Sequence, residues 1–256
     1  MIEWILRGLG KGVVTTRYPA RPEPVAAGFQ GAVDVLEAGG ADAALAALCP
    51  TGAIRVEDHR ISLDRGRCIL CGACVEAAPE RFRFTPRLET ACRRRSALVV
   101  GEAPAHGLEE VRRALGERTR TLRRSIHVRH VDAGSDGAEE WEIAALTNPY
   151  YDVQRLGVFF TAAPRHADVL LVTGGVTEPM RRPLERAYDA MPEPKAVVAA
   201  GTDACSGGVA ATTGAVAGGV DAVLPVDVYV PGSPPSPITL LHGLLLAVGL
   251  VAEAAA

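Results

Sequence analysis

The pattern of apolar positions changes near residue 125. Beyond it, short apolar runs that end near glycine alternate with amphipathic stretches. The runs at 125–134, 166–175, 195–201 and 222–232 predict strands, and the stretches 139–148, 177–191 and 236–254 predict helices. Alternation of this kind predicts a parallel sheet with helices on both faces. Because a site in such a sheet lies beyond the carboxyl ends of the strands, the loops 134–140, 201–208 and 231–237 are the first to inspect.

The pattern before residue 125 is different. Residues 1–24 begin with "WILRGLGKGVV", which predicts a short amphipathic helix, and continue into a segment broken by prolines. Residues 25–92 hold short segments and turns. The stretch 93–124 is strongly basic and places Leu108, Val111 and Leu115 on one helical face. We expect its arginines to cover a solvated helix and linker.

Composition limits the class of protein. The chain has 256 residues, 48% of them hydrophobic and 22% charged, which is typical of a globular protein with one large domain or two small ones. A net charge of −3 argues against a protein that mainly binds nucleic acid. We expect no secretory leader, and the longest apolar run, 238–252, is too short to span a bilayer. In a reducing compartment, six cysteines indicate metal ligands rather than disulfides.

Three cysteines, Cys68, Cys71 and Cys74, lie three residues apart in "RCILCGACVEAAPERF". In the bacterial ferredoxin run C-x₂-C-x₂-C-x₃-C-P, a fourth cysteine precedes the proline; here that position is Ala78. The fourth cysteine of such a run ligates the other cluster of a two-cluster ferredoxin. Cys49, which stands before a proline in "LCPTGAI", therefore completes the ligand set of Cys68, Cys71 and Cys74.

The missing ligands of the ferredoxin pattern belong to one set. Counting back from Cys49, the partners of the other cluster fall on Gly39, Asp42 and Leu45, and its fourth falls on Ala78. One whole set is absent and the other is complete, so the pattern predicts a single four-iron four-sulfur cluster. A zinc site and unrelated free cysteines are the alternatives. The repeated x₂ spacing followed by proline favours the cluster. Cys92 and Cys205 lie outside this spacing.

The chain resembles two known families in succession. The stretches "GLGKGVVTTRYP" and "CPTGAI" with the cysteine run are similar to ferredoxin-like subunits of formate hydrogenlyase and related membrane-bound hydrogenases. The stretches "HVRHVDAGSDGAEEWEIAAL", "NPYYDVQRLGV" and "PPSP" resemble the small subunit of group 4 nickel–iron hydrogenases, a relative of the complex I B subunit. The resemblance implies a fusion of two modules that are usually separate subunits.

The part of the chain that resembles the hydrogenase small subunit lacks the cysteines that bind a cluster in that family. In that family four cysteines hold a terminal cluster, and the resemblance places their positions at Asp136, Glu139, Asp203 and Ser233. Carboxylates and hydroxyls are poor ligands for iron–sulfur clusters. The four side chains would instead form a hard-oxygen site for a divalent cation or a carboxylate cluster that handles protons. The simpler interpretation, which we favour, is a partly wet cavity refilled with polar residues.

These observations define the expected protein. The expected fold is an α+β ferredoxin-like module followed by an α/β domain with a parallel, flavodoxin-like sheet. The expected parts are an N-terminal docking extension (1–24), a ferredoxin-like single-cluster domain (25–92), a basic linker or helix (93–124) and a small-subunit-like domain (125–256).

The resemblance implies a peripheral iron–sulfur subunit at the cytoplasmic face of the membrane. Its implied partners are a hydrogenase large-subunit-like protein and membrane subunits of a complex I-like or antiporter-like arm. Its contribution would be electron transfer rather than catalysis, and the alternative is a non-redox scaffold with a structural cluster. We expect the "WILRGL" segment to dock against the partners, and the apolar helix 238–252 to be buried against a partner or against the sheet of its own domain.

Overall fold

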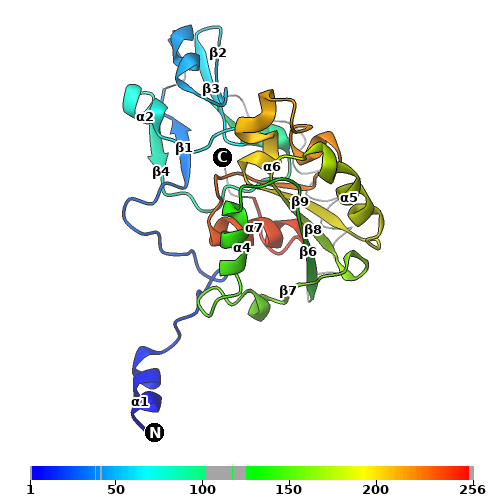
Figure 1. The fold of residues 1–256 in the computed structure, drawn as a ribbon. Coiled ribbons are helices and arrows are strands. Elements are labelled where there is room, and N and C mark those ends of the chain that lie inside the picture. Colours follow the sequence, from blue (N-terminus) through cyan, green and yellow to red (C-terminus); the bar gives the residue numbers. More distant parts are fainter. Residues whose placement is uncertain (1, 38, 41, 102–116, 118–124, 254–256) are drawn as a thin grey trace.

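The computed structural model describes residues 2–37, 39–40, 42–101, 117 and 125–253. Figure 1 shows two modules, with the first (blue to cyan) set against one end of the second (green to red). The α+β module followed by an α/β domain confirms the fold expected from the sequence. The face formed by Leu108, Val111 and Leu115 lies outside the described residues.

The first module is built from two small antiparallel sheets. One pairs β1 (Ala32–Val35) with β4 (Phe82–Thr85), and the other has the order β2 (Ile54–Glu57), β3 (Arg60–Asp64), β5 (Val99–Val100). The 3₁₀ helix η1 (Ala43–Leu48) and the short helix α2 (Ala73–Ala77) complete the module. Its hydrophobic core is small. This core includes Ile61, Leu63, Phe82 and Cys74.

The second module is organised around a five-stranded sheet in which all neighbours are parallel. Its spatial order is β10 (Val228–Val230), β9 (Ala196–Ala200), β8 (Val169–Thr173), β6 (Ile126–Asp132), β7 (Val158–Phe160). This is the flavodoxin order, in which the chain reverses direction across the sheet between its first and third strands, here β6 and β8. Every residue of β8 and β9 is buried, as the continuous apolar runs predict. The short edge strand β7 is absent from the sequence prediction.

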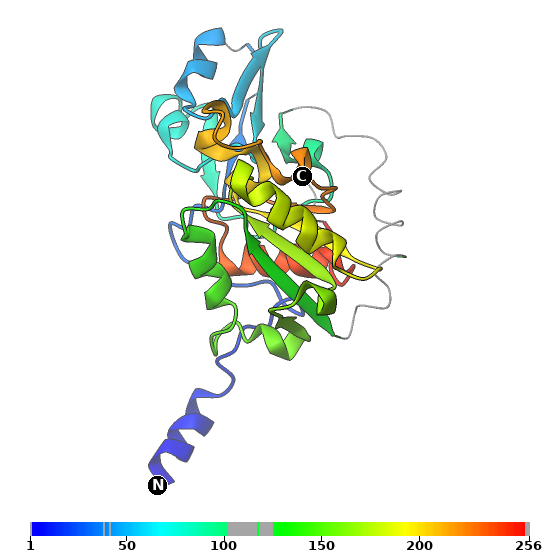
Figure 2. The same cartoon turned by 45° about the vertical axis from the view of Figure 1, so that its right-hand side comes forward.

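Helices cover both faces of this sheet (Figure 2). The core on one face includes residues of α4 (Ala138–Ala145) and α7 (Pro237–Ala247). The core on the other face includes residues of α5 (Glu178–Asp189) and α6 (Thr202–Ser206). Short 3₁₀ helices occupy the connections: η4 (Val153–Leu156), η5 (Pro164–His166), η6 (Gly208–Thr212) and η7 (Val220–Ala222).

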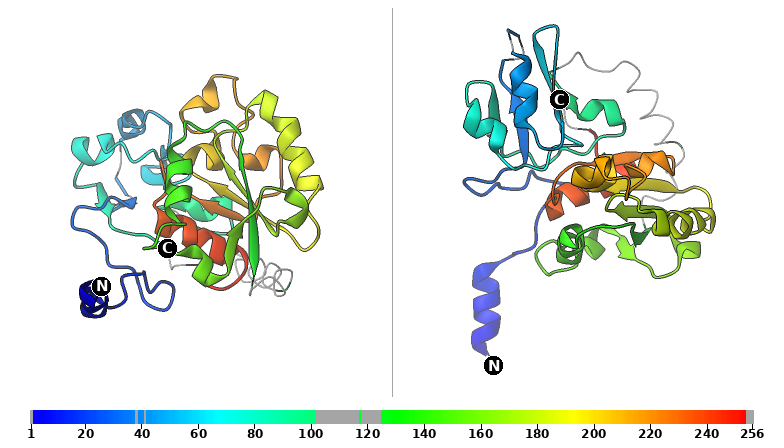
Figure 3. Two further views of the ribbon diagram at one scale, coloured as in Figure 1. Left: turned by 60° about the horizontal axis from the view of Figure 1, so that its bottom comes forward. Right: turned by 45° about the horizontal axis from the view of Figure 1, so that its top comes forward.

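The two segments expected to dock differ in exposure. Every residue of α7 is buried within the chain, so this helix packs on the sheet of its own domain, which was one of the two expected alternatives, and not on a partner. The helix α1 (Ile2–Lys11) has no buried residue and projects away from both modules (Figure 3). The chain returns to the second module at Thr16, whose N–H donates to the Tyr150 carbonyl (2.8 Å), and at Tyr18, which is 2% exposed in the core. No helix among the described residues is long and apolar enough to cross a bilayer.

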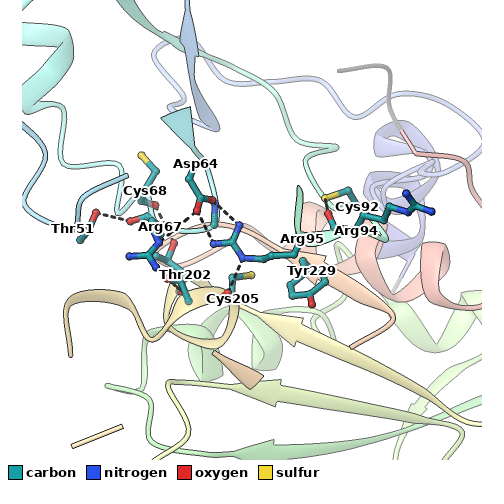
Figure 4. Close-up of polar contacts among 12 residues, drawn as sticks. Thr51, Asp64, Arg67, Cys68, Cys92, Arg94, Arg95, Thr202, Cys205 and Tyr229 are labelled. Carbon is teal, nitrogen blue, oxygen red and sulfur yellow. Dashed lines mark hydrogen bonds and ion pairs between the residues drawn. The ribbon is translucent and has the colours of Figure 1, made fainter. Parts of the chain in front are cut away.

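The two modules meet along a seam formed by residues 92–98 (Figure 4). Arg95, at the start of the 3₁₀ helix η2 (Arg95–Leu98), donates both terminal guanidinium nitrogens to Asp64 of the first module, each at 2.7 Å. Its Nε donates to the Cys205 carbonyl of the second module (3.0 Å). One planar side chain therefore holds an ion pair in one module and a helix carbonyl in the other.

Neighbouring residues extend the seam. The backbone of Cys92 exchanges two hydrogen bonds with Tyr229 of β10 (3.0 and 2.8 Å), forming an antiparallel bridge on the outer edge of the parallel sheet. Arg93 is 6% exposed and donates to the Leu246 carbonyl at the end of α7 (3.0 Å). The arginines at 93 and 95 were expected on a solvated linker, and this expectation is wrong because both enter interfaces within the chain.

Replacing Arg95 with methionine should therefore weaken the whole chain. Asp64 would stay largely buried and would keep the Gly66 N–H (2.9 Å) and the more distant Arg67 (3.6 Å), so we expect the free energy of unfolding to fall by about 2–3 kcal/mol. Arg182→Met on the exposed side of α5 is the matched control and should change it by less than about 0.5 kcal/mol. Anaerobic urea unfolding, followed by circular dichroism, measures both. Equal effects of the two substitutions would mean that Arg95 does not hold the seam.

Candidate functional site

The four cysteines of the predicted cluster line one cavity in the first module. Cys49 ends η1, Cys68 and Cys71 lie in the loop after β3, and Cys74 lies in the first turn of α2. Two left-handed residues, Leu70 (φ 55°) and Gly72 (φ 80°), turn this loop around the cavity. The sequence predicted all four residues, and the fold brings them together from three separate segments.

The thiols that line the cavity have different surroundings. The Ala53 N–H donates to the Cys49 sulfur (3.2 Å), and the Thr51 hydroxyl lies 3.4 Å from it. Burial raises the pKa of the Cys49 thiol, but contacts with Thr51 and nearby N–H groups outweigh burial and leave the pKa below its usual value. Burial, together with the neighbouring thiols, raises the pKa of Cys68 to about 12. Four soft donors around one cavity fit an iron–sulfur cluster.

The other two cysteines lie elsewhere. Cys92 is buried in the seam, where its thiol donates to the Arg94 carbonyl (3.3 Å), and burial raises its pKa to about 12. Cys205 is 1% exposed under the parallel sheet and donates to the Ala199 carbonyl (3.7 Å). Neither lines the cavity of the other four. In the described part of the chain, no three His, Cys, Asp or Glu side chains already stand in coordinating positions, so the four thiols would reorient on binding.

The positions of a second ferredoxin cluster are filled with ordinary core and cap residues. Ala78 is 2% exposed in the core of the first module, and Leu45 packs against that core. Asp42 caps η1 by accepting from the Ala44 N–H (2.9 Å). None of these three side chains can supply a thiolate to a second cluster.

The four family positions of the second module lie at the carboxyl end of the parallel sheet. Asp136 and Glu139 follow β6, Asp203 follows β9, and Ser233 follows β10. Glu139 is buried, Asp203 is half-buried, and Asp136 and Ser233 are exposed. Burial, followed by the charges of Asp203, Asp136 and Glu140, raises the pKa of Glu139 to about 7. The three acidic side chains are therefore neighbours, and the expected open wet cavity is closed where Glu139 lies.

The cluster loop is in direct contact with this end of the sheet. The Thr202 hydroxyl donates to the Cys68 carbonyl (3.0 Å) and lies within hydrogen-bond distance of the Gly232 carbonyl (3.1 Å) (Figure 4). Thr202 stands between Gly201 and Asp203 and is fully buried. Sequence reasoning missed both Thr202 and Arg95. In the sequence, Thr202 is marked only as a hydroxyl residue that follows a glycine at the end of a strand. Arg95 is marked only as one of three consecutive arginines. Both patterns are common.

Comparisons with known proteins follow the division into modules. Residues 61–115 match the family described as 4Fe-4S single cluster domain. This range contains Cys92 but not Cys49, so the cavity geometry, rather than the match, favours Cys49 as the fourth ligand. Residues 137–247 match the family described as NADH ubiquinone oxidoreductase, 20 Kd subunit.

Individual relatives agree with these matches. The chain is 42% identical to formate hydrogenlyase subunit 7 of Escherichia coli (strain K12) over 132 residues. It spans about half the length of that relative, because the aligned part covers 52% of each. A chain from the structure of the membrane-bound sulfane sulfur reductase, an archaeal respiratory membrane complex, is 28% identical with a TM-score of 0.46. That alignment covers 52% of this chain and 74% of the other.

The two matches fall on the two modules that the structure separates, and both agree with the resemblance derived from the sequence. Residues 61–115 are therefore similar to ferredoxin-like 4Fe-4S domains, and residues 137–247 are similar to the 20 Kd subunits of NADH ubiquinone oxidoreductase, which agrees with the identity to a formate hydrogenlyase subunit.

Proposed function

We propose that this protein is an electron-transfer subunit that carries one four-iron four-sulfur cluster, held by Cys49, Cys68, Cys71 and Cys74. The observation that carries the proposal is that these four thiols, from three segments, line one cavity inside the 4Fe-4S domain. A bound cluster of this kind accepts and releases one electron at a time. The protein's own residues hold the thiolates, supply N–H groups to sulfur, and limit access of water.

The thiols that line the cavity differ in their exposure to solvent. Cys74 is buried and Cys71 is exposed, so one corner of the site faces solvent or a partner. The Cys68 corner faces the second module through Thr202. An electron would enter or leave most readily through the Cys71 corner, where the least protein separates the site from another molecule.

We propose that the second module holds no cluster. Asp136, Glu139, Asp203 and Ser233 offer oxygen where the family has thiolates, and soft iron–sulfur clusters select sulfur donors. Loss of this site removes the usual route from the first module through the second to a large subunit. Electron transfer in this protein would therefore begin and end at the first module.

We propose that the protein is a peripheral subunit at the cytoplasmic face of a membrane-bound complex. The support is the identity with a formate hydrogenlyase subunit and the match to a respiratory-complex subunit family. The proposed partners are a hydrogenase large-subunit-like protein and membrane subunits of a complex I-like or antiporter-like arm. The exposed helix α1, with Ile5, Leu6 and Leu9 on one face, is the part of this chain that we assign to docking.

A structural role for the cluster is the second candidate. The Cys68 carbonyl accepts from Thr202, so the cluster loop is also part of the seam between the modules. If the cluster only stabilises this seam, reduction and reoxidation should lead to loss of iron. Repeated reversible reduction with full retention of iron would support electron transfer instead.

Iron content tests the ligand set. Anaerobically purified protein should contain about four irons per chain, and Cys49→Ser should reduce that content as severely as Cys71→Ser, because each removes one of four ligands. Cys92→Ala is the matched control outside the cavity and should keep the full content. Iron and sulfide analysis with the visible absorption spectrum measures all three. Full iron in Cys49→Ser, with loss in Cys92→Ala, would replace Cys49 by Cys92 as the fourth ligand.

Electron paramagnetic resonance tests the second module. On reduction with dithionite we expect one signal of a reduced four-iron cluster, integrating to about one spin per chain. The quadruple substitution of Asp136, Glu139, Asp203 and Ser233 by alanine should leave that signal in place, since none of these residues ligates the cluster. About eight irons, or a second signal that this quadruple variant abolishes, would mean that the second module binds a cluster.

A further inference from the structure

The second module contains a buried acid, Glu139, and within the described residues one of its two carboxylate oxygens has no hydrogen-bond partner. Glu139 is 3% exposed, and the oxygen without a partner is Oε2. Its carboxylate lies directly against Gly201, where a Cβ atom would be 2.4 Å from Oε1. A buried charge without a partner is strongly unfavourable, so this position requires either a proton or a cation.

The groups that face Glu139 are all acidic. Asp136 reaches it from the loop after β6, Glu140 from α4, and Asp203 from α6. Within the described residues, no lysine, arginine or histidine forms an ion pair with Glu139 or Asp203. His130 contacts Glu140 (3.3 Å), and Glu140 also accepts from Thr173 and Ser135. The described surroundings of Glu139 therefore lack a positive charge that would balance these carboxylates.

A proton satisfies this site with less rearrangement than a metal ion. Asp136 already accepts from the Ala138 N–H (2.9 Å), and the described carboxylates do not stand in coordinating positions. A divalent cation would need several oxygens to converge, whereas a proton needs only Glu139. The charges of the neighbouring acids favour protonation, and Glu139 then titrates near neutral pH.

The site is also coupled by contact to the proposed cluster. The Cys68 carbonyl accepts from Thr202, Thr202 follows Gly201, and Gly201 touches the Glu139 carboxylate. A unit negative charge that arrives within about 10 Å raises the proton affinity of a carboxylate roughly tenfold at an effective dielectric constant of about 20. Asp203 and Asp136, which are half-buried and exposed, connect Glu139 to solvent.

We propose that Glu139 is a redox-linked proton site, which takes up one proton from solvent when the first module gains one electron and releases it on oxidation. The electron comes from any one-electron reductant of sufficiently low potential, and no bond other than the carboxyl O–H forms or breaks. This inference rests on the proposed function, because it requires a reducible cluster at the four cysteines.

Midpoint potentials as a function of pH test the proposal. In the wild type, Glu139 is protonated in both redox states below about pH 7 and ionised in both well above pH 8, so the potential is flat at both ends. Between these two pH limits the midpoint potential should fall by about 59 mV in total, if the proton affinity of Glu139 differs tenfold between the two redox states. Glu139→Gln should abolish this fall. Glu80→Gln, which removes an exposed carboxylate of the first module, should keep it.

A further variant and a second measurement complete the test. Asp203→Asn should move the fall to lower pH, because a negative neighbour that raises the Glu139 pKa is removed. If Glu139→Gln does not fold, reduced-minus-oxidised infrared spectra of the wild type should still show a protonated carboxyl band that appears on reduction and shifts in D₂O. Absence of that band overturns the proposal.

The outcomes separate the two proposals. Protein without iron or a reducible signal would overturn the proposed function. A reducible cluster with a flat potential in the wild type would overturn only the proton site. A potential that responds to added Mg²⁺ or Mn²⁺, but not to pH, would assign a divalent cation to Glu139 and its neighbours and would also overturn the proton site.

Discussion

The structure depends on one guanidinium group. The Arg95 side chain binds a carboxylate of the first module and a backbone carbonyl of the second. Its planar fork fixes Asp64 at the end of β3, and the cluster loop begins immediately after this residue. The same loop then meets Thr202 at the end of β9. The relative placement of the four thiols and the parallel sheet therefore follows from a short, well-ordered set of polar contacts.

Much of the fold could be predicted from local pattern. The runs that became β8 and β9 are apolar because a parallel sheet buries both faces, and this pattern is visible without any tertiary information. The strand β7 was missed because a three-residue edge strand has too few positions to show a period. The run 222–232 gave only three strand residues, since Pro225 and the turn before it prevent pairing.

The residues of the candidate site also divide into those that the sequence could predict and those that it could not. Cys49 could be predicted because ferredoxin spacing assigns ligands across runs, a rule that is written in the sequence. Arg95 and Thr202 could not, because their roles depend on which surfaces the two modules present to each other. The burial of Glu139 is also a tertiary property: the sequence shows three acids and a serine in three strand-end regions, but not that one of them is closed off from water. A thiolate at such a buried position would bind a soft metal ion. A carboxylate at the same position requires a positive charge instead.

The bridge between Cys92 and Tyr229 has a consequence for how the chain avoids self-association. The strand β10 lies at the edge of the parallel sheet, and open edges are templates on which other chains can add strands and aggregate. In this protein Cys92, on the segment that leads out of the first module, pairs with Tyr229 of that edge, so the chain itself blocks part of the edge. Two separate polypeptides would expose the edge until they met, whereas a single chain covers it by an intramolecular step whose rate does not depend on concentration.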